Sequence, residues 1–242
     1  MKKLSIITIT YNAEKTLERT LKSVYEQSYA EIEHIIVDGK STDRTLDLIN
    51  KYQNHKMKWI SEPDDGLYYA MNKGVKMATG DYICFLNAGD TFFTNTTIDE
   101  IMYSANDLPQ SPDIIYGETA IVNKNGTFLH MRRLETPRYL NWKSFKKGML
   151  VCHQAFIVKS EQVEEYNTNY RFSSDFDWCI RMMKKSSIIH NTGEVLINYL
   201  NEGVTTANQK ASLIERYKIM VKHYGGISTF VHHLGFIIRA VC

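Results

Sequence analysis

Polar residues follow three apolar stretches in the first ninety residues of the chain. These residues are Thr10-Tyr11-Asn12, Asp38-Gly39 and Asn87-Ala88-Gly89-Asp90. If the stretches are parallel strands, their carboxyl ends share one edge of a sheet, where open α/β proteins bind ligands. An aspartate there could hold a divalent cation and, through it, a phosphate, because hard cations prefer oxygen ligands. The same residue types also end strands as simple turns, so the pattern alone leaves both interpretations open.

The segments that must position these residues alternate between strand and helix patterns. Strands are predicted around residues 4–10, 34–39, 57–63 and 81–86, and helices around 14–25, 44–52 and 67–80. Such alternation is typical of βαβ units with a parallel sheet. The continuous apolar runs indicate strands covered on both faces. We therefore predict an α/β fold with a Rossmann-like, mostly parallel central sheet flanked by helices.

The pattern changes after about residue 110. Two β-like runs flank Asn125-Gly126, a strong hairpin signal. "SSDFDWCIRMMKK" predicts a helix capped by Ser173 or Ser174, and "SIIHNTGEVLINYL" predicts a strand. From about Lys210 the chain is predicted to be helical. The second half is therefore expected to be mixed α+β.

Composition excludes several classes of protein. The 242 residues are 43% hydrophobic and carry 29 Lys and Arg against 27 Asp and Glu, which argues against a nucleic-acid partner. The cysteines, which are Cys84, Cys152, Cys179 and Cys242, form no C-x-x-C pair and suit a reducing cytoplasm. The threonine-interrupted N-terminus predicts a first strand rather than a signal peptide. No segment is apolar enough to span a bilayer.

Five ordered motifs resemble those of family 2 glycosyltransferases, inverting enzymes with a GT-A fold, and are most similar to bacterial members that build surface polysaccharides such as capsule and O-antigen. The motifs are "SIITITYN", "IIVDGKSTDRT", "SEPDDGLYYAMNKGVKMATGDYICFLNAGD", "CHQAFIV" and "SSDFDWCIR". The resemblance implies a glycosyltransferase domain over residues 1–208, with a nucleotide-sugar-binding half (1–110) and an acceptor and catalytic-base half (111–208). Residues 209–242 would then form a helical extension.

The resemblance also implies a role for each matching residue. The donor would be a nucleotide-diphosphate sugar, with UDP as the expected nucleotide, and the cofactor Mg²⁺ or Mn²⁺. Asp90 matches the metal-binding aspartate, and Asp175 the catalytic base. The residues matched to nucleotide-sugar binding are Thr10, Tyr11, Asn12, Asp38, Lys73, Asn87, Ala88 and Gly89. Tyr68, His153 and Asp177 are candidates for the acceptor or donor pocket, although residues such as Tyr68 and His153 more often pack in a core, and Tyr68 could do both.

Three departures from the family pattern keep a second hypothesis open. Asn87 replaces the leading acid of the metal motif, Ser174 replaces the acid before the catalytic base, and Tyr69 lies where relatives commonly have an aspartate. Asp175 or Asp177 could be the base, and the register of the motif favours Asp175. The alternative is a non-catalytic partner in a polysaccharide assembly complex. A nucleotidyltransferase is disfavoured because "TYNAEKT" lacks a phosphate-binding glycine.

The chemistry of the predicted reaction needs few groups. A cation would stabilise the leaving diphosphate, and one carboxylate would take the proton of the acceptor hydroxyl in a single inverting displacement. The acceptor is expected to be a glycan, in this branch a lipid-linked one. The apolar tail "STFVHHLGFIIRAVC" could lie on the inner membrane surface as an amphipathic helix. It could equally pack on the protein or form a homodimer interface.

Overall fold

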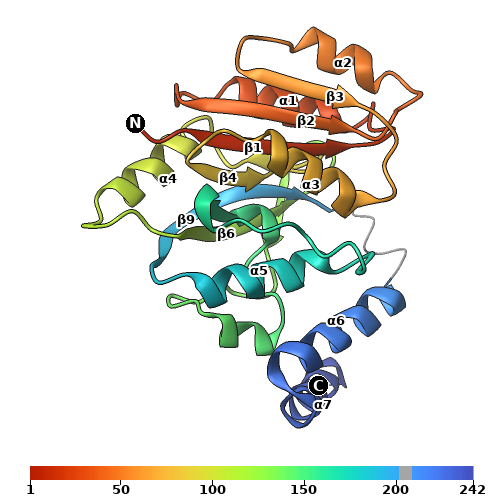
Figure 1. The fold of residues 1–242 in the computed structure, drawn as a ribbon, viewed down its shortest axis with the longest axis vertical. Coiled ribbons are helices and arrows are strands. Elements are labelled where there is room, and N and C mark those ends of the chain that lie inside the picture. Colours follow the sequence, from red (N-terminus) through yellow and green to blue (C-terminus); the bar gives the residue numbers. More distant parts are fainter. Residues whose placement is uncertain (202–208, 242) are drawn as a thin grey trace.

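One sheet of nine strands forms the centre of the described residues, which are 1–201 and 209–241 of the computed structural model (Figure 1). The strands are β1 (Leu4–Thr10), β2 (Ile32–Asp38), β3 (Met57–Ser61), β4 (Tyr82–Phe85), β5 (Thr91–Phe92), β6 (Ile114–Val122), β7 (Phe128–Met131), β8 (Phe156–Lys159) and β9 (Ile189–Leu200). They are ordered β3-β2-β1-β4-β8-β6-β9-β5, and β7 pairs with β6.

Helices cover the sheet and extend from one end of it. The α-helices are α1 (Leu17–Tyr25), α2 (Thr45–Lys51), α3 (Leu67–Met77), α4 (Thr97–Asn106), α5 (Ser174–Lys185), α6 (Gln209–Tyr224) and α7 (Gly226–Val241). Three short 3₁₀ helices are η1 (Trp142–Lys147), η2 (His153–Ala155) and η3 (Ser160–Gln162). In Figure 1, α6 and α7 lie at the end of the molecule opposite β3 and α2.

The predicted fold class is confirmed: the chain has a GT-A architecture. β3, β2, β1 and β4 are mutually parallel, as the βαβ pattern predicted. Every residue of β1 and β2 is buried, which explains their continuous apolar runs. The second half is mixed: β8 is antiparallel to both β4 and β6, whereas β9 is parallel to β6.

The predicted hairpin is also present, as β6 and β7. Gly126 has φ +80°, a left-handed conformation that glycine adopts without strain. The Asn123 side-chain oxygen accepts hydrogen bonds from the N–H groups of Asn125 and Thr127, at 2.9 and 3.0 Å. The loop is therefore held by local contacts, which is why its sequence could reveal it.

The N-terminus of α5 is capped differently from the prediction. Ser173 occupies the capping position, but its hydroxyl bonds with Ser212 of α6 and caps nothing. The N–H groups of Arg171, Phe172 and Ser173, which precede the helix, donate to the Glu215 carboxylate at 2.8 to 3.0 Å. Ser173 therefore lies at the predicted capping position, but its hydroxyl makes no capping bond because Ser212 of α6 engages it.

A buried ion cluster joins α5 to α6. The Asp177 side chain is completely buried and accepts from Arg181 at 2.8 Å, Lys222 at 3.1 Å and His223 at 2.8 Å. Although burial opposes its ionisation, hydrogen bonds from His223, Arg181 and Lys222 hold the pKa of Asp177 well below its usual range. Asp177 therefore fixes α6 to the body of the protein.

The C-terminal helices continue the main core. Ile219 and Met220 of α6 are buried in the same apolar cluster as the sheet. α7 packs against α6 and η1. Among the described residues, none of the helices combines the length and the apolar character needed to cross a membrane. The domain boundary predicted near residue 208 and Cys242 lie outside the described residues, and Cys84, Cys152 and Cys179 are buried free thiols.

We expect Asp177→Asn to lower the free energy of unfolding at pH 7 by about 3 kcal/mol, the low end for a broken buried ion pair, since Lys222 is half exposed. Because the folded pKa is depressed, the stabilisation is present above pH ~4, the unfolded value, and is lost as the pH falls further. Urea unfolding of both proteins from pH 3 to 8 measures this. Asp107→Asn, at an exposed site, is the control. Equal stability of the two variants would contradict the assignment.

Candidate functional site

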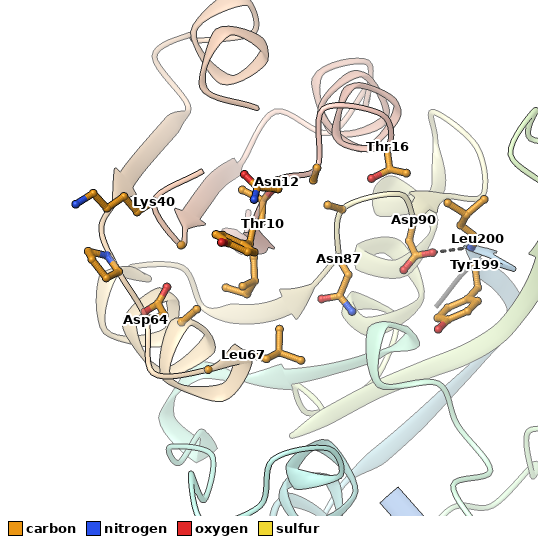
Figure 2. Close-up of a pocket in the computed structure, with 18 residues that line it drawn as sticks. Thr10, Asn12, Thr16, Lys40, Asp64, Leu67, Asn87, Asp90, Tyr199 and Leu200 are labelled. Carbon is orange, nitrogen blue, oxygen red and sulfur yellow. Dashed lines mark hydrogen bonds between the residues drawn. The ribbon is translucent and has the colours of Figure 1, made fainter. Parts of the chain in front are cut away.

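A cleft of about 850 Å³ lies at the carboxyl ends of the parallel strands. Its size is within the range of small-molecule sites in proteins. Four segments that follow β1, β2, β3 and β4, together with the start of α3 and the end of β9, line it (Figure 2). Of the residues predicted to bind nucleotide or metal, the cleft is lined by Thr10, Tyr11, Asn12, Asn87, Ala88 and Asp90.

The segment after β1 presents one buried and one exposed side chain to this cleft. The Thr10 hydroxyl is buried and has no hydrogen-bond partner among the described residues, whereas Tyr11 is 65% exposed. Asn12 has a left-handed φ of +48°. Its side-chain oxygen accepts from Thr42 N–H at 2.9 Å, and its own N–H donates to the Ser41 hydroxyl at 2.8 Å. The loop after β2 therefore fixes the conformation of this segment.

Two predicted residues lie behind the cleft surface. Asp38 is fully buried and accepts hydrogen bonds from Ser41 N–H at 2.9 Å and the Ser61 hydroxyl at 2.6 Å. Lys73 pairs with Asp64 at 2.6 Å and with Glu62 at 2.7 Å. Neither Asp38 nor Lys73 lines the cleft, so both act on its shape and charge through their neighbours.

The backbone conformation of the turn after β4 explains why the turn contains a glycine. Asp90 N–H donates to the Asn87 carbonyl at 3.0 Å, closing a tight turn in which Gly89 has φ +105°. A side chain at position 89 would be strained there and would also press on Leu200. Thr20 of α1 accepts from Gly89 N–H at 2.9 Å and donates to the Asp90 carbonyl at 2.7 Å. The turn thus directs both Asn87 and Asp90 into the cleft (Figure 2).

The Asp90 carboxylate is nearly buried. One oxygen accepts from Leu200 N–H and the other from the Gln154 side-chain N–H, both at 2.6 Å. Burial raises the pKa of Asp90 to about 6, although these hydrogen bonds favour the ionised form. Asp90 therefore carries a negative charge at neutral pH that is hydrogen-bonded by neutral donors, with the positive charge of Arg19 as a weaker influence.

The donor atoms here suit a cation that is shared with a ligand. The residues described contain no group of three or more His, Cys, Asp or Glu side chains that would enclose a metal ion. Asp90 supplies one carboxylate, and the buried Asn87 side-chain oxygen has no hydrogen-bond partner among these residues. Mg²⁺ commonly takes one or two carboxylates and completes its shell with phosphates and water. The residues present therefore fit such a cation if a diphosphate accompanies it.

Asp175 lies at the first turn of α5, outside the cleft lining. The Tyr68 hydroxyl donates to its Oδ1 at 3.2 Å, and Phe176 N–H donates to the same oxygen at 2.9 Å. Burial and then the charge of Asp175 raise the pKa of Tyr68, which keeps this hydroxyl a proton donor. Tyr68 belongs to α3, whose Leu67 and Ala70 line the cleft, so α3 connects Asp175 to it.

The remaining two candidates have partners within the protein. His153 is buried, stacks on Phe85 at 5.0 Å and bonds with the Tyr166 hydroxyl. Burial lowers the pKa of His153 to about 4, so it is neutral at pH 7. This favours the core interpretation of His153. Asp177 faces α6 through its ion cluster and does not line the cleft.

The structure adds residues that the motifs did not single out. Asp64 and Lys40 line the cleft after β3 and β2, and Tyr199 and Leu200 line it from β9 (Figure 2). Asp64 follows a predicted strand end, so the rule that located Asp90 could have located it too. No local signal pointed to Tyr199 or Leu200. Gln154 was quoted within "CHQAFIV" without a role, yet it binds both Asn87 N–H and Asp90.

A polar cleft at the carboxyl edge of a mostly parallel sheet is a typical small-molecule binding site. The model of "Glycosyl transferase family 2" matches residues 5–166, and the chain belongs to that family, as the motifs predicted. Over 204 residues the chain is 29% identical to the "PGL/p-HBAD biosynthesis glycosyltransferase" of Mycobacterium bovis, covering 82% of this chain and 76% of that protein. It is 25% identical over 215 residues to the "putative teichuronic acid biosynthesis glycosyltransferase TuaG" of Bacillus subtilis, covering 86% and 84%.

Solved structures share the fold. S. aureus TarS 1–349 in complex with UDP-GlcNAc superposes with a TM-score of 0.74 at 20% identity, covering 90% of this chain and 64% of that one. The mannosyltransferase PcManGT from Pyrobaculum calidifontis, in complex with GDP-Man and Mn²⁺, gives 0.66 at 16% identity, covering 91% and 64%. This chain therefore spans a little under two thirds of either chain.

We expect Gln154→Ala to destabilise the protein by about 1–3 kcal/mol, because it leaves Asn87 N–H and one Asp90 oxygen buried without their partner. Urea unfolding measures the change, with Gln110→Ala at an exposed position as the control. A loss no larger than that of the control would mean that Gln154 does not hold the site together.

Proposed function

We propose that this glycosyltransferase moves a sugar from a nucleotide-diphosphate donor to a hydroxyl of a surface glycan, with inversion at the sugar. The observation that carries the proposal is the cleft, where the Thr10 hydroxyl and the Asn87 oxygen are buried beside the Asp90 carboxylate and have no hydrogen-bond partner among the described residues. Unpaired buried polar atoms are costly unless a ligand satisfies them. The solved relatives that hold UDP-GlcNAc or GDP-Man support a donor of this class.

Within the proposal, Asp90 and Asn87 would hold Mg²⁺ or Mn²⁺ together with the donor diphosphate. That cation would supply Lewis-acid stabilisation of the negative charge on the leaving group. Thr10, Tyr11 and Asn12 would bind the nucleoside. Asp64, whose charge is balanced by Lys73, would accept hydrogen bonds from the base or ribose. UDP is the expected nucleotide.

Asp175 would act as the base. Its position at the first turn of α5 lets the helix dipole favour the ionised carboxylate that a base requires. Because Tyr68 donates to Oδ1, that oxygen is held in place, and the other oxygen is the one to take the acceptor proton. The names of the mycobacterial and Bacillus relatives support a glycan or glycolipid of the cell surface as the acceptor.

We expect nucleotide and Mn²⁺ together to raise the melting temperature of the wild type, since a ligand that binds only the folded state stabilises it. The screen uses UDP, GDP, dTDP and CMP, each with and without Mn²⁺. Asp90→Ala should lose the metal-dependent part of the shift. Asp175→Ala should keep the shift and lose at least ~100-fold in donor turnover, measured as nucleotide released from the donor sugar.

Asp107→Ala, at an exposed site, is the matched control and should behave as the wild type. The metal-dependent shift should also weaken as the pH falls below about 6, because protonation of Asp90 competes with the cation. A wild type that shifts with none of the four nucleotides would favour the non-catalytic partner instead. Full turnover in Asp175→Ala would show that Asp175 is not the base.

The surface of α6 and α7 supports the expected membrane contact. Six apolar side chains there are 40% to 86% exposed: Leu213, Ile214, Tyr217, Ile227, Phe230 and Val231. Tyr217 of α6 contacts His233 of α7, with ring centroids 5.0 Å apart, so the two helices present one surface. η1 adjoins it, where the Lys143 and Lys146 side chains lie over the Trp142 and Tyr224 rings.

Charge favours an anionic membrane as the occupant of this surface. Residues 138–147 and 209–233 contain eight Lys and Arg and one acid, which leaves 21 Lys and Arg against 26 Asp and Glu in the rest of the chain. Of the eight, Lys222 is paired with the buried Asp177 and the Nε of Arg216 is buried, so six remain for the surface. That one acid, Glu215, accepts hydrogen bonds from the N–H groups that precede α5. A basic surface with apolar side chains is typical of proteins that lie on anionic bilayers.

We expect the full chain to sediment with vesicles that contain phosphatidylglycerol and not with pure phosphatidylcholine. Ile227→Glu/Phe230→Glu should abolish the binding, because the charges oppose insertion of the apolar side chains. Tyr103→Glu, at a 76% exposed aromatic on α4, is the control. Lack of vesicle binding together with a dimer in light scattering would assign the surface to a second copy instead.

A further inference from the structure

Three lysine side chains gather around one pair of stacked aromatic rings. The rings belong to Trp142 of η1 and Tyr224 of α6, with centroids 5.6 Å apart and planes 8° from parallel. The ammonium groups of Lys143 and Lys184 lie 5.6 and 4.7 Å from the centroid of the Trp142 ring. That of Lys146 lies 5.6 Å from the centroid of the Tyr224 ring. We call these five residues the lysine–aromatic cluster.

Hydrogen bonds hold the stack in place. The Tyr224 hydroxyl donates to the Trp142 carbonyl at 2.6 Å, which ties the end of α6 to η1. The side chain of Asn141 caps the start of η1 by accepting from Lys143 N–H at 2.9 Å. The two rings are therefore a fixed platform, and the lysines reach it from η1 and from α5.

No carboxylate of the described part of the chain forms an ion pair with any of these three lysines. Their recorded side-chain contacts are with the two rings and, for Lys184, with Nδ1 of His223 at 2.9 Å. The face of an aromatic ring attracts a cation but has no net charge of its own. The cluster consequently keeps a surplus of positive charge.

The acids closest to the cluster in the sequence or the fold are engaged elsewhere. Residues 136–160, which include η1, contain no Asp or Glu. Asp177, on the far side of His223, already accepts from Arg181 and Lys222. Glu215 accepts from the N–H groups that precede α5. An external anion is therefore the partner that these lysines lack.

The number and type of the charges favour a phosphate with more than one negative charge. An ammonium group is a compact charge with three hydrogen-bond donors, and lysine is a common phosphate ligand. A phosphomonoester carries about 1.5 to 2 negative charges at neutral pH, whereas a phosphodiester carries only one. Three lysines therefore match a phosphomonoester or a diphosphate better than a phosphodiester. None of the five residues of the cluster lines the nucleotide cleft.

The position of the cluster favours a lipid as the source of that phosphate. The exposed Ile227 follows Tyr224 by three residues, and the exposed Phe230 lies one turn further along α7, which packs against η1. Tryptophan and tyrosine beside apolar side chains are typical of the bilayer interface. Lysines at that level meet the head groups of lipids.

We propose that the lysine–aromatic cluster binds the head group of a membrane lipid that carries a phosphomonoester or a diphosphate. The inference rests on the proposed membrane contact of α6 and α7 and adds a defined site to it. The apolar side chains of α7 would enter the bilayer while the three lysines bind head-group oxygens at its edge. Diffuse attraction responds to surface charge alone, whereas such a site distinguishes head groups at equal surface charge.

The test compares phosphatidylcholine vesicles that contain phosphatidic acid, a phosphomonoester, with vesicles that contain phosphatidylglycerol, a phosphodiester, adjusted to the same zeta potential. We expect the wild type to sediment with the phosphatidic acid vesicles at least about tenfold more tightly, the worth of one charge-assisted hydrogen bond. Lys143→Gln/Lys184→Gln should bind both kinds equally. Lys15→Gln/Lys124→Gln removes the same charge at exposed positions elsewhere and should keep the preference.

Inorganic pyrophosphate separates a lipid head group from a free phosphate. It is titrated in EDTA, so that no divalent cation takes it into the nucleotide cleft, and binding is followed by tryptophan fluorescence, with Trp142→Phe identifying the signal of the cluster. A preference for phosphatidic acid supports the proposal whether or not pyrophosphate binds. Pyrophosphate binding without that preference assigns the cluster to a soluble phosphate and overturns the lipid ligand.

Failure of the site and failure of the membrane contact give different results. Equal binding of both vesicles by the wild type, or the same preference in Lys143→Gln/Lys184→Gln, overturns the site and leaves the membrane contact intact. A wild type that binds neither kind removes the membrane contact and the lipid ligand together. The melting temperature of the double variant is expected to equal that of the wild type, because both lysines are exposed, and it excludes unfolding as the cause.

Discussion

The buried Asp90 carboxylate is the constraint on which the site depends. A charge that is taken out of water must be compensated, and this one accepts hydrogen bonds from Gln154 and Leu200. Those partners come from η2 and the end of β9, which are remote in sequence from β4. The same bonds that make a buried aspartate tolerable therefore draw the second half of the chain against the first. The wall of the cleft is the result.

The raised pKa of Asp90 shows that this arrangement compensates the charge of the buried carboxylate only in part. Two neutral donors and the charge of Arg19 do not fully offset the burial of this carboxylate, so a cation beside it would be favourable. The buried and unpaired Asn87 oxygen lies in the same cleft. The site is thus slightly destabilised on its own, and a cation with a diphosphate would relieve it. Such a cost is common where a protein binds a ligand.

Asp175 and Asp177 show how one helix separates two chemically identical groups. Residues two apart on an α-helix lie on nearly opposite sides of it, because each residue turns the helix by about 100°. Asp177 consequently faces α6 and is neutralised by Arg181, Lys222 and His223. Asp175 faces α3 and, among the residues that the structure describes, accepts hydrogen bonds from the Tyr68 hydroxyl and a main-chain N–H. The helix geometry gives a physical reason for the preference that the motif register expressed.

The sequence by itself determined the features that depend on neighbouring residues. Continuous apolar runs specified the buried parallel strands β1, β2 and β4. Gly126 and Gly89 marked the hairpin and the turn before Asp90, because each adopts a conformation that other residues resist. Polar residues at strand ends placed Thr10, Asn12 and Asn87 in one cleft, since parallel strands end at one edge.

Only the tertiary structure decided the contacts between distant segments. Leu200 reaches Asp90 across 110 residues, and Glu215 of α6 binds the main chain just before α5, where the Ser173 hydroxyl bonds with Ser212 instead of capping the helix. Tyr199 likewise lines the cleft without any local sequence pattern that predicts it. Such contacts follow from how the sheet and α6 pack, and packing is specified by the whole set of apolar side chains together. A local motif shows which residues can do chemistry, and the packing selects their partners.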